Sequence, residues 1–378
     1  MKIKPTLLAI GLSLGSASLV GAQTHYVYLT GSTAARNAVY QTLITAGAVF
    51  DAAPTATTQG SSTAAKATYM TFVGNIGGVP FSVKCDWSGS EGGIQDLTQG
   101  QSENFLADGA PSSSSSPGPF VSQAVDLAMA DNAQSFSKNP TPILTTGKEV
   151  CVIPFMLVKE VGSASDLSNV TDAQFRVAIT GGAKLALFTG NAADTSFVYI
   201  TGRDDNSGTR VNTFGTTGFG IFNVPSQVEL NSSGQMLDPN GDGSYVTSEG
   251  YPSGGSVATQ MGVNCSSTVD QINPGITGIS VVGYLGISDA NTALGLGATQ
   301  VAYNGVLESP TTVIEGQYGI WGNEYCYERN GASGDATTVF GKLTGSNGIT
   351  HNSDGSTTID LTLMHASRQG PTADPVHK

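Results

Sequence analysis

The chain has 378 residues, of which 39% are hydrophobic and 12% charged, with a formal net charge of −13 at pH 7. This length can form two ordinary domains or one large one. The composition argues against a disordered chain, and the acidic balance disfavours a nucleic-acid partner, which would need a basic face. Glycine accounts for 49 residues without a G-X-Y period, which indicates turns and close backbone approaches rather than collagen.

An export signal is predicted at the start of the chain, over residues 1–22. Lys2 and Lys4 give it a positive start, residues 7–20 are apolar or small, and Ala22 ends a run of small residues suited to cleavage. A membrane anchor is the alternative, but this apolar run is shorter and richer in Gly and Ser than a membrane-spanning helix usually is. We therefore expect a periplasmic or otherwise exported protein, cleaved near Ala22.

Strands alternate with helices along the rest of the chain. The expected elements, in order, are a strand at 25–30, a helix after Thr33, a hairpin at 69–87, a short helix after Ser90, buried strands at 124–131 and 149–161, a helix capped by Thr171, and strands at 196–201, 281–288 and 316–330. The stretch 99–119, which contains PSSSSSPGP, is expected to be a flexible loop. The alternation predicts an α/β fold with mostly parallel sheets.

Three of these strands run into small, polar turns that begin a helix. The turns read LTGSTAA at 29–35, WSGSEGGI at 87–94 and TGRDDNSGTR at 201–210. A helix N-terminus offers unpaired N–H donors and a partial positive charge. Several such turns that converge at the ends of strands would form a pocket for an anion.

With these turns in this order, the chain resembles the PstS-like phosphate-binding receptors of high-affinity phosphate ABC transporters. The matching pieces are TGSTAARNAVY, GSEGGIQDL, VDLAMAD, RDDNSGTR and INPGITGISVVGYLGIS. The resemblance implies a two-lobed periplasmic-binding-protein-like α/β fold with two hinge strands, near 151–159 and 318–327. After the signal at 1–22, lobe 1 would comprise 23–150 plus 328–378, and lobe 2 would comprise 151–327 with the hinge strands.

The resemblance also implies which residues bind phosphate. They are Thr33, Ala34, Ser90, Asp131, Arg203, Asp205, Ser207, Gly208 and Thr209. Arg203 would supply a full positive charge, and Asp205 would orient it through a charge-assisted pair. Asp131 would accept a hydrogen bond from a phosphate O–H, which fully ionised sulfate cannot offer. Glu91 departs from the family pattern, because it places a carboxylate beside the expected anion.

The same residues have ordinary structural interpretations. Arg203 could be a surface arginine paired with Asp204 or Asp205, and Asp131 and the hydroxyl residues could be simple helix caps. Asp204 and Arg210 are expected to be solvated.

The four cysteines, Cys85, Cys151, Cys265 and Cys326, lie too far apart in sequence for a CxxC zinc site. An exported chain can form disulfides, for which four cysteines allow three pairings, or the cysteines can remain free thiols with a structural role. Because both expected hinge strands carry a cysteine, a Cys151–Cys326 bridge is the preferred pairing.

A second motif, DPNGDGSYVTSE, fits the twelve-residue calcium loop. Asp238, Asn240, Asp242 and Glu249 would supply oxygens, and Gly243 the sharp turn. The stretch is also a strong hairpin turn, so calcium would be at most a structural ion, and no cofactor is expected to be required.

The expected function is capture of inorganic phosphate by an exported receptor, which hands it to the membrane permease of a phosphate ABC transporter. The protein would act as a monomer and would bind no nucleic acid. The alternative is a non-transport phosphate scavenger or a surface adhesion protein on the same fold. An enzyme is not expected, because the sequence has no nucleophile elbow, no P-loop and no clustered histidines.

Overall fold

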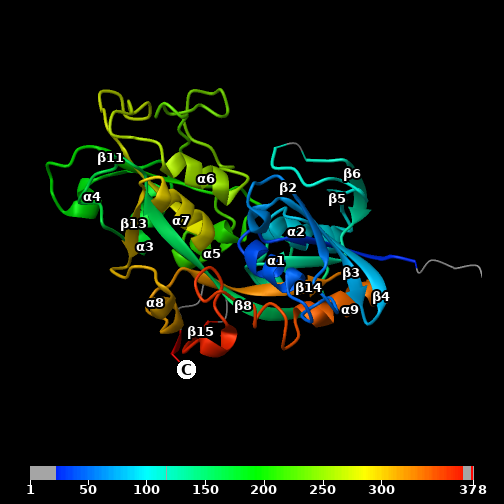
Figure 1. The fold of residues 1–378 in the computed structure, drawn as a ribbon. Coiled ribbons are helices and arrows are strands. Elements are labelled where there is room, and N and C mark those ends of the chain that lie inside the picture. The colour runs from blue at the N-terminus through cyan, green and yellow to red at the C-terminus, as the bar shows by residue number, and fades with distance from the viewer. Residues whose placement is uncertain (1–22, 116, 369–375, 378) are drawn as a thin grey trace, which may run out of the picture.

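The computed structural model describes residues 23–115, 117–368 and 376–377 of the chain. The predicted export signal lies outside these residues. Two groups of helices and strands lie side by side, joined by the long strands β8 (Thr146–Lys159) and β14 (Trp321–Glu328) (Figure 1). Within the described part of the chain, no helix is both long and apolar enough to cross a membrane.

The first half contains the N-terminal strands and one helix from the C-terminal part of the chain. Its strands follow the order β2 (Thr55–Gln59), β3 (Tyr69–Ile76), β4 (Val79–Asp86), β1 (His25–Gly31) and β7 (Leu127–Ala130). The central strand β1 is parallel to both of its neighbours, β4 and β7. Its helices are α1 (Arg36–Ile44), α2 (Ser90–Gln99) and α9 (Gly334–Leu343).

The second half is built around the buried strand β12 (Ser280–Gly286), which is parallel to β11 (Phe197–Thr201) and antiparallel to β8. The shorter strands are β9 (Asn169–Val170), β10 (Ala183–Lys184) and β13 (Thr299–Tyr303). Its helices are α3 (Asp172–Ala178), α4 (Ala186–Thr189), α5 (Gly208–Thr216), α6 (Gly254–Met261), α7 (Ile287–Gly295) and α8 (Pro310–Ile314). Thr171 caps α3 through a capping box, which confirms the predicted cap.

The two joining strands make the sheet continuous across the molecule. The end of β8 pairs with β12 in the second half, and the rest of β8 pairs with β14. The last four residues of β14 pair with β7 in the first half. The register between β8 and β14 shifts at a bulge between Glu324 and Tyr325. The strand β8 covers the hinge candidate near 151–159, and β14 covers the candidate near 318–327 from residue 321 onward.

Two features of the fold differ from the sequence predictions. The sheet is mixed rather than mostly parallel, because β8 and β14 run antiparallel to each other and to their other neighbours. The expected flexible loop at 99–119 contains β5 (Ser102–Leu106), which pairs with β6 (Phe120–Ala124). The remaining elements are β15 (Ala366–Ser367), β16 (Val376–His377) and the 3₁₀ turns Ala64–Lys66, Gln134–Phe136 and Leu361–Leu363.

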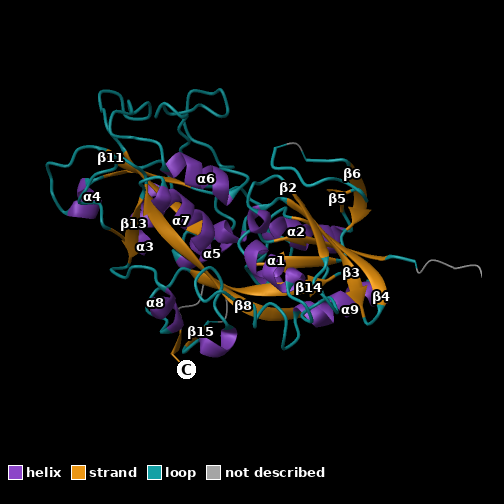
Figure 2. Cartoon of the chain, viewed as in Figure 1, coloured by secondary structure: helices purple, strands orange, loops and turns teal. Residues whose placement is uncertain are grey.

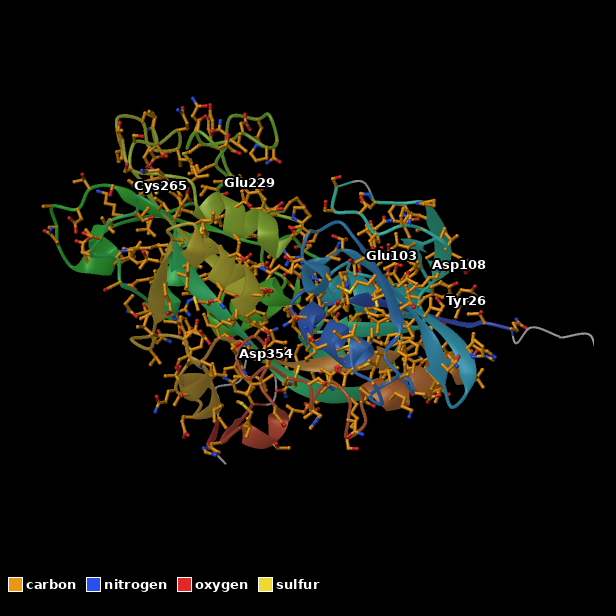
Figure 3. All side chains as sticks on the ribbon, viewed as in Figure 1. Tyr26, Glu103, Asp108, Glu229, Cys265 and Asp354 are labelled. Atoms are coloured by element: carbon orange, nitrogen blue, oxygen red, sulfur yellow. The ribbon has the colours of Figure 1, made fainter. Side chains whose placement is uncertain are left out.

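All four cysteines are buried and free, so the predicted Cys151–Cys326 disulfide is wrong. The strand register gives the reason: Cys151 lies opposite Glu324, and Cys326 lies opposite Lys148. The two thiols therefore lie at different positions along the adjacent strands β8 and β14, and not opposite each other as a disulfide between them would need. Cys265 lies apart from both, in the second half (Figure 3).

Candidate functional site

The N-termini of α2 and α5 meet where the two halves of the molecule touch (Figure 2). Ser90 is the first residue of α2, and Ser207 caps α5 by accepting a hydrogen bond from the Arg210 N–H. A Cβ atom added to Gly208 would lie 2.4 Å from Ser90 Oγ and 2.8 Å from Asp131 Cβ. Only glycine allows this approach of two helix starts from different halves.

Asp131 follows β7 and lies at the centre of this contact. The Ser32 hydroxyl donates to its carboxylate, and its own backbone N–H donates to Ser90 Oγ at 3.1 Å. The Asn212 amide donates to the Asp131 carbonyl oxygen at 2.9 Å, which links β7 to α5. The residue is only 2% exposed, and this burial raises the pKa of its carboxyl, while the neighbouring hydroxyls and the charge of Arg203 act in the opposite direction.

Arg203 lies just after β11 and is 3% exposed. Its guanidinium donates to the carbonyl oxygens of Tyr251 at 3.2 Å and Pro252 at 3.0 Å, and to Thr33 Oγ1 at 3.3 Å. The nearest carboxylate oxygen, on Asp204, is 4.0 Å from Nη2. Arg203 is therefore not a surface arginine, and neutral oxygens hold its charge in place.

The expectation that Asp205 orients Arg203 does not hold. Asp205 pairs instead with Arg210 at 2.5 Å and with Lys138 at 2.7 Å, and its side chain is 50% exposed. Arg210 is not solvated as expected, because it is buried and donates to the carbonyl oxygens of Arg203, Ser248 and Glu249. One turn into α5, its side chain faces inward and fixes the backbone that carries Arg203.

Glu91 points away from the contact between the helix starts. One carboxylate oxygen accepts from the Asn132 amide at 2.8 Å, and the other accepts from the Ser137 hydroxyl and the Lys138 N–H. Burial raises the pKa of Glu91, and these hydrogen bonds oppose that rise. The Glu91 carboxylate therefore holds the 132–138 segment in place. At the contact between the helix starts, Glu91 contributes only its backbone N–H, which donates to the Asn206 carbonyl oxygen.

The first turn adds an arginine that the sequence interpretation missed. Thr33 and Ala34 line a crevice that also contains Arg36, the first residue of α1, and Asp289 of α7. Burial lowers the pKa of Arg36, the charge of Arg203 adds to this effect, and the charge of Asp289 opposes it. Arg36 therefore adds a second guanidinium, close enough to Arg203 for the two charges to interact. The signal in the sequence that could have identified Arg36 was its position directly after TGSTAA.

Of the remaining predicted ligands, Thr209 is buried in the first turn of α5. The structure thus brings together Thr33, Ser90, Asp131, Arg203, Ser207, Gly208 and Thr209, with Ala34 in the adjoining crevice. Two further polar residues, Ser32 and Asn212, tie Asp131 to the first turn and to α5.

The predicted calcium loop is an exposed turn held by its own backbone. Asp238 accepts from the N–H groups of Asp242 and Gly243, and Asn240 donates to the Val246 carbonyl oxygen. The Glu249 carbonyl oxygen accepts from Arg210, far from the start of the loop. Among the described residues, no group of three or more His, Cys, Asp or Glu side chains is placed to hold a metal ion.

Comparison of the sequence with protein-family models and with curated proteins gives no match. Comparison of the fold with solved structures does give matches. A putative phosphate ABC transporter substrate-binding protein from Clostridium perfringens, solved with bound phosphate, aligns over 89% of this chain and 100% of its own, with a TM-score of 0.51 and 12% identity. The chain therefore has the fold of a two-lobed substrate-binding protein.

Two other solved structures align less closely. A phosphate transport receptor from Vibrio cholerae covers 83% of this chain and 91% of its own, with a TM-score of 0.44 and 12% identity. PstS from Borrelia burgdorferi covers 85% and 93%, with a TM-score of 0.41 and 14% identity.

Proposed function

We propose that the protein is an exported receptor that binds inorganic phosphate between its two halves and delivers it to the membrane permease of an ABC transporter. One observation carries this proposal: the starts of α2 and α5 meet around Asp131, with Arg203 beside them. Helix starts supply N–H donors and a partial positive charge, which suit an oxyanion.

Each group in the site would have a distinct role. Arg203 would neutralise part of the anion charge, because its hydrogen-bond partners are neutral oxygens and its nearest carboxylate oxygen, on Asp204, is 4.0 Å away. Asp131 would accept the hydrogen bond from a phosphate O–H. The donors to the bare oxygens would be the hydroxyl and backbone N–H groups of Thr33, Ala34, Ser90, Ser207, Gly208 and Thr209. Asp205 is not among the proposed ligands, because Arg210 and Lys138 engage it.

The two halves would open and close around this site by bending at β8 and β14. These two strands pair with each other and together link the halves, because β8 also pairs with β12 and β13 of the second half and β14 also pairs with β7 of the first. The fold of the Clostridium perfringens protein, which was solved with phosphate, supports a binding protein rather than an enzyme. We propose lobe boundaries near residues 150 and 328, a monomer, and location in the periplasm or another exported compartment.

Calorimetry with phosphate, arsenate and sulfate tests the proposal. Heat of binding is expected with phosphate and arsenate between pH 5 and 8, and little with sulfate, because sulfate offers Asp131 no proton. No heat with phosphate anywhere in this range would overturn the receptor function. Equal heats for sulfate and phosphate would overturn only the role given to Asp131.

A second measurement separates the receptor from a phosphate scavenger or adhesion protein on the same fold. The phosphate-loaded receptor is expected to stimulate ATP hydrolysis by a phosphate permease reconstituted in vesicles. Phosphate binding without stimulation would favour the scavenger. Release of phosphate from a generic phosphate ester would instead favour an enzyme.

A further inference from the structure

Glu324 lies on the joining strand β14, directly beside the proposed phosphate acceptor. Its neighbour Tyr325 pairs with Ala130, the last residue of β7, so Glu324 is level with Asp131. The bulge between Glu324 and Tyr325 falls at this point, and bulges re-aim side chains. The Glu324 side chain is fully buried, with 0% exposure.

No ordinary hydrogen-bond donor in the described part of the chain supplies a proton to the carboxyl oxygens of Glu324. Its carboxyl group lies close enough to the Asp131 carboxyl and the Ser32 hydroxyl to interact with both. Ser32 has a single hydroxyl proton, and this proton is donated to Asp131. Counting ordinary donors among the described residues, neither Glu324 oxygen receives a hydrogen bond. Two carboxyl groups in contact cannot both ionise at low cost, so one of them must carry the proton that joins them.

We propose that Asp131 and Glu324 share one proton, with Glu324 as the donor, and that Glu324 is the positioning residue that keeps Asp131 ionised and aimed at the ligand. This inference rests on the proposed function and deepens it. While the proton is shared, the pair carries one negative charge. Loss of that proton would place a second negative charge behind the anion and oppose binding.

The surroundings favour this arrangement. Burial and the adjacent Asp131 raise the pKa of Glu324 well above its usual range. The charge of Arg203 acts on Asp131 in the opposite direction and favours its ionised form. Three other titratable groups on β8 and β14 interact with the charge of Glu324, and burial raises their pKa values, so they stay neutral well into the alkaline range: Cys151, Cys326 and Tyr327.

The Glu324→Gln variant tests the proposal through its pH profile. A glutamine amide can donate to Asp131 as a protonated glutamic acid does, but it cannot ionise. Near pH 7 the variant is expected to bind phosphate within about threefold of wild type, since the key hydrogen bond is kept. On the alkaline side the wild type is expected to lose about tenfold in affinity per pH unit once the pair loses its proton, and the variant to lack this loss.

Glu328→Gln is the matched control. Glu328 lies on the same strand, is buried, and accepts from the Thr337 hydroxyl at 2.5 Å, away from Asp131. Its variant is expected to follow the wild-type pH profile of phosphate binding. A Glu324→Gln profile that matches wild type and Glu328→Gln across the alkaline range would overturn the shared proton.

Thermal unfolding without ligand separates this inference from the proposed function. A carboxyl whose pKa is raised by folding contributes stability that is full below its unfolded-state pKa and is lost as pH rises through its folded pKa. Wild type should therefore lose more Tm toward alkaline pH than Glu324→Gln, even if phosphate does not bind at all. Coincident Tm profiles would overturn the inference. Glu324→Met, close in volume and also unable to ionise, replaces the variant if Glu324→Gln does not fold.

Discussion

Two polar turns of this molecule, at 201–210 and 238–249, look alike in sequence and differ completely in structure. Both are rich in Asp, Asn, Ser and Gly. In the first turn, Arg203 and Arg210 are buried, and Arg203 bonds to Thr33 of the other half. In the second, Asp242 is exposed and Asp238 half-buried, and both accept hydrogen bonds from N–H groups of the turn itself. The comparison teaches that polar residues become a site through distant partners, which supply burial and fixed geometry.

The strongest test of this contrast removes the buried charge of the first turn. Arg203→Ala is expected to weaken phosphate binding about a hundredfold, the equivalent of about 3 kcal/mol for hydrogen bonds to a charged group. Asp238→Ala, in the second turn, is expected to leave the affinity unchanged. Calorimetry measures both variants, and circular dichroism checks that each is folded. Wild-type affinity in folded Arg203→Ala would remove this residue from the site.

A second test separates the two helix starts. Gly208→Ala places a methyl group 2.4 Å from Ser90 Oγ, so the halves must move apart where the ligand is expected. We expect about a tenfold loss of phosphate affinity, since overpacking costs about 1–3 kcal/mol. Gly341→Ala in α9 is the control, because its added methyl group meets nothing within 4 Å. Equal affinities for the two variants would mean that the helix starts do not meet in the bound state.

A smaller effect is expected from the exposed acid of the first turn. Asp205→Asn weakens the ion pairs with Lys138 and Arg210, and the Lys138 pair joins the two halves. Surface pairs contribute about 0.2–1 kcal/mol, so we expect phosphate affinity to fall about two- to fivefold. Asp242→Asn should change nothing. The difference between these variants should shrink at 0.5–1 M salt, because salt screens exposed charges, and a difference that grows with salt would contradict this role.

The smallest effect is expected from the second turn itself. Asp238 already accepts two backbone N–H groups of its own turn, so the turn holds its shape through these bonds. Adding calcium or a chelator is expected to shift Tm by less than about 1 °C, since a ligand stabilises only in proportion to its binding to the folded state. A calcium-dependent rise of several degrees, lost in Asp242→Asn, would instead make this turn the calcium loop that its sequence pattern resembles.

Local signals in the sequence predicted much of the fold. The cap at Thr171, the hairpin at 69–86 and the helix starts after Ser90 and Ser207 depend on a few adjacent residues, and these elements form as expected. Strand direction depends on distant pairing, so the antiparallel course of β8 and β14 was not predicted. The β5–β6 pair was also missed, because the Ser- and Pro-rich composition between these strands is typical of a loop.

Within the site, residue types were easier to predict than partners. The turn that contains Arg203 was singled out from its sequence, but the pairing of Asp205 with Arg210 depends on how α5 packs. The direction of the Glu91 side chain depends on the 132–138 segment, whose N–H groups donate hydrogen bonds to its carboxylate. Glu324 had no local signal, because it reaches Asp131 only through the register of β7 and β14.

The four buried thiols can report which part of the molecule unfolds first. Cys85 lies in the first half, Cys265 in the second, and Cys151 and Cys326 on the strands between them. Thiol reagents attack the thiolate, and burial holds the pKa of every one of these groups high, so each is protected while its surroundings stay closed. The order in which a thiol reagent labels them under mild denaturant would therefore show which half unfolds first, without any engineered probe.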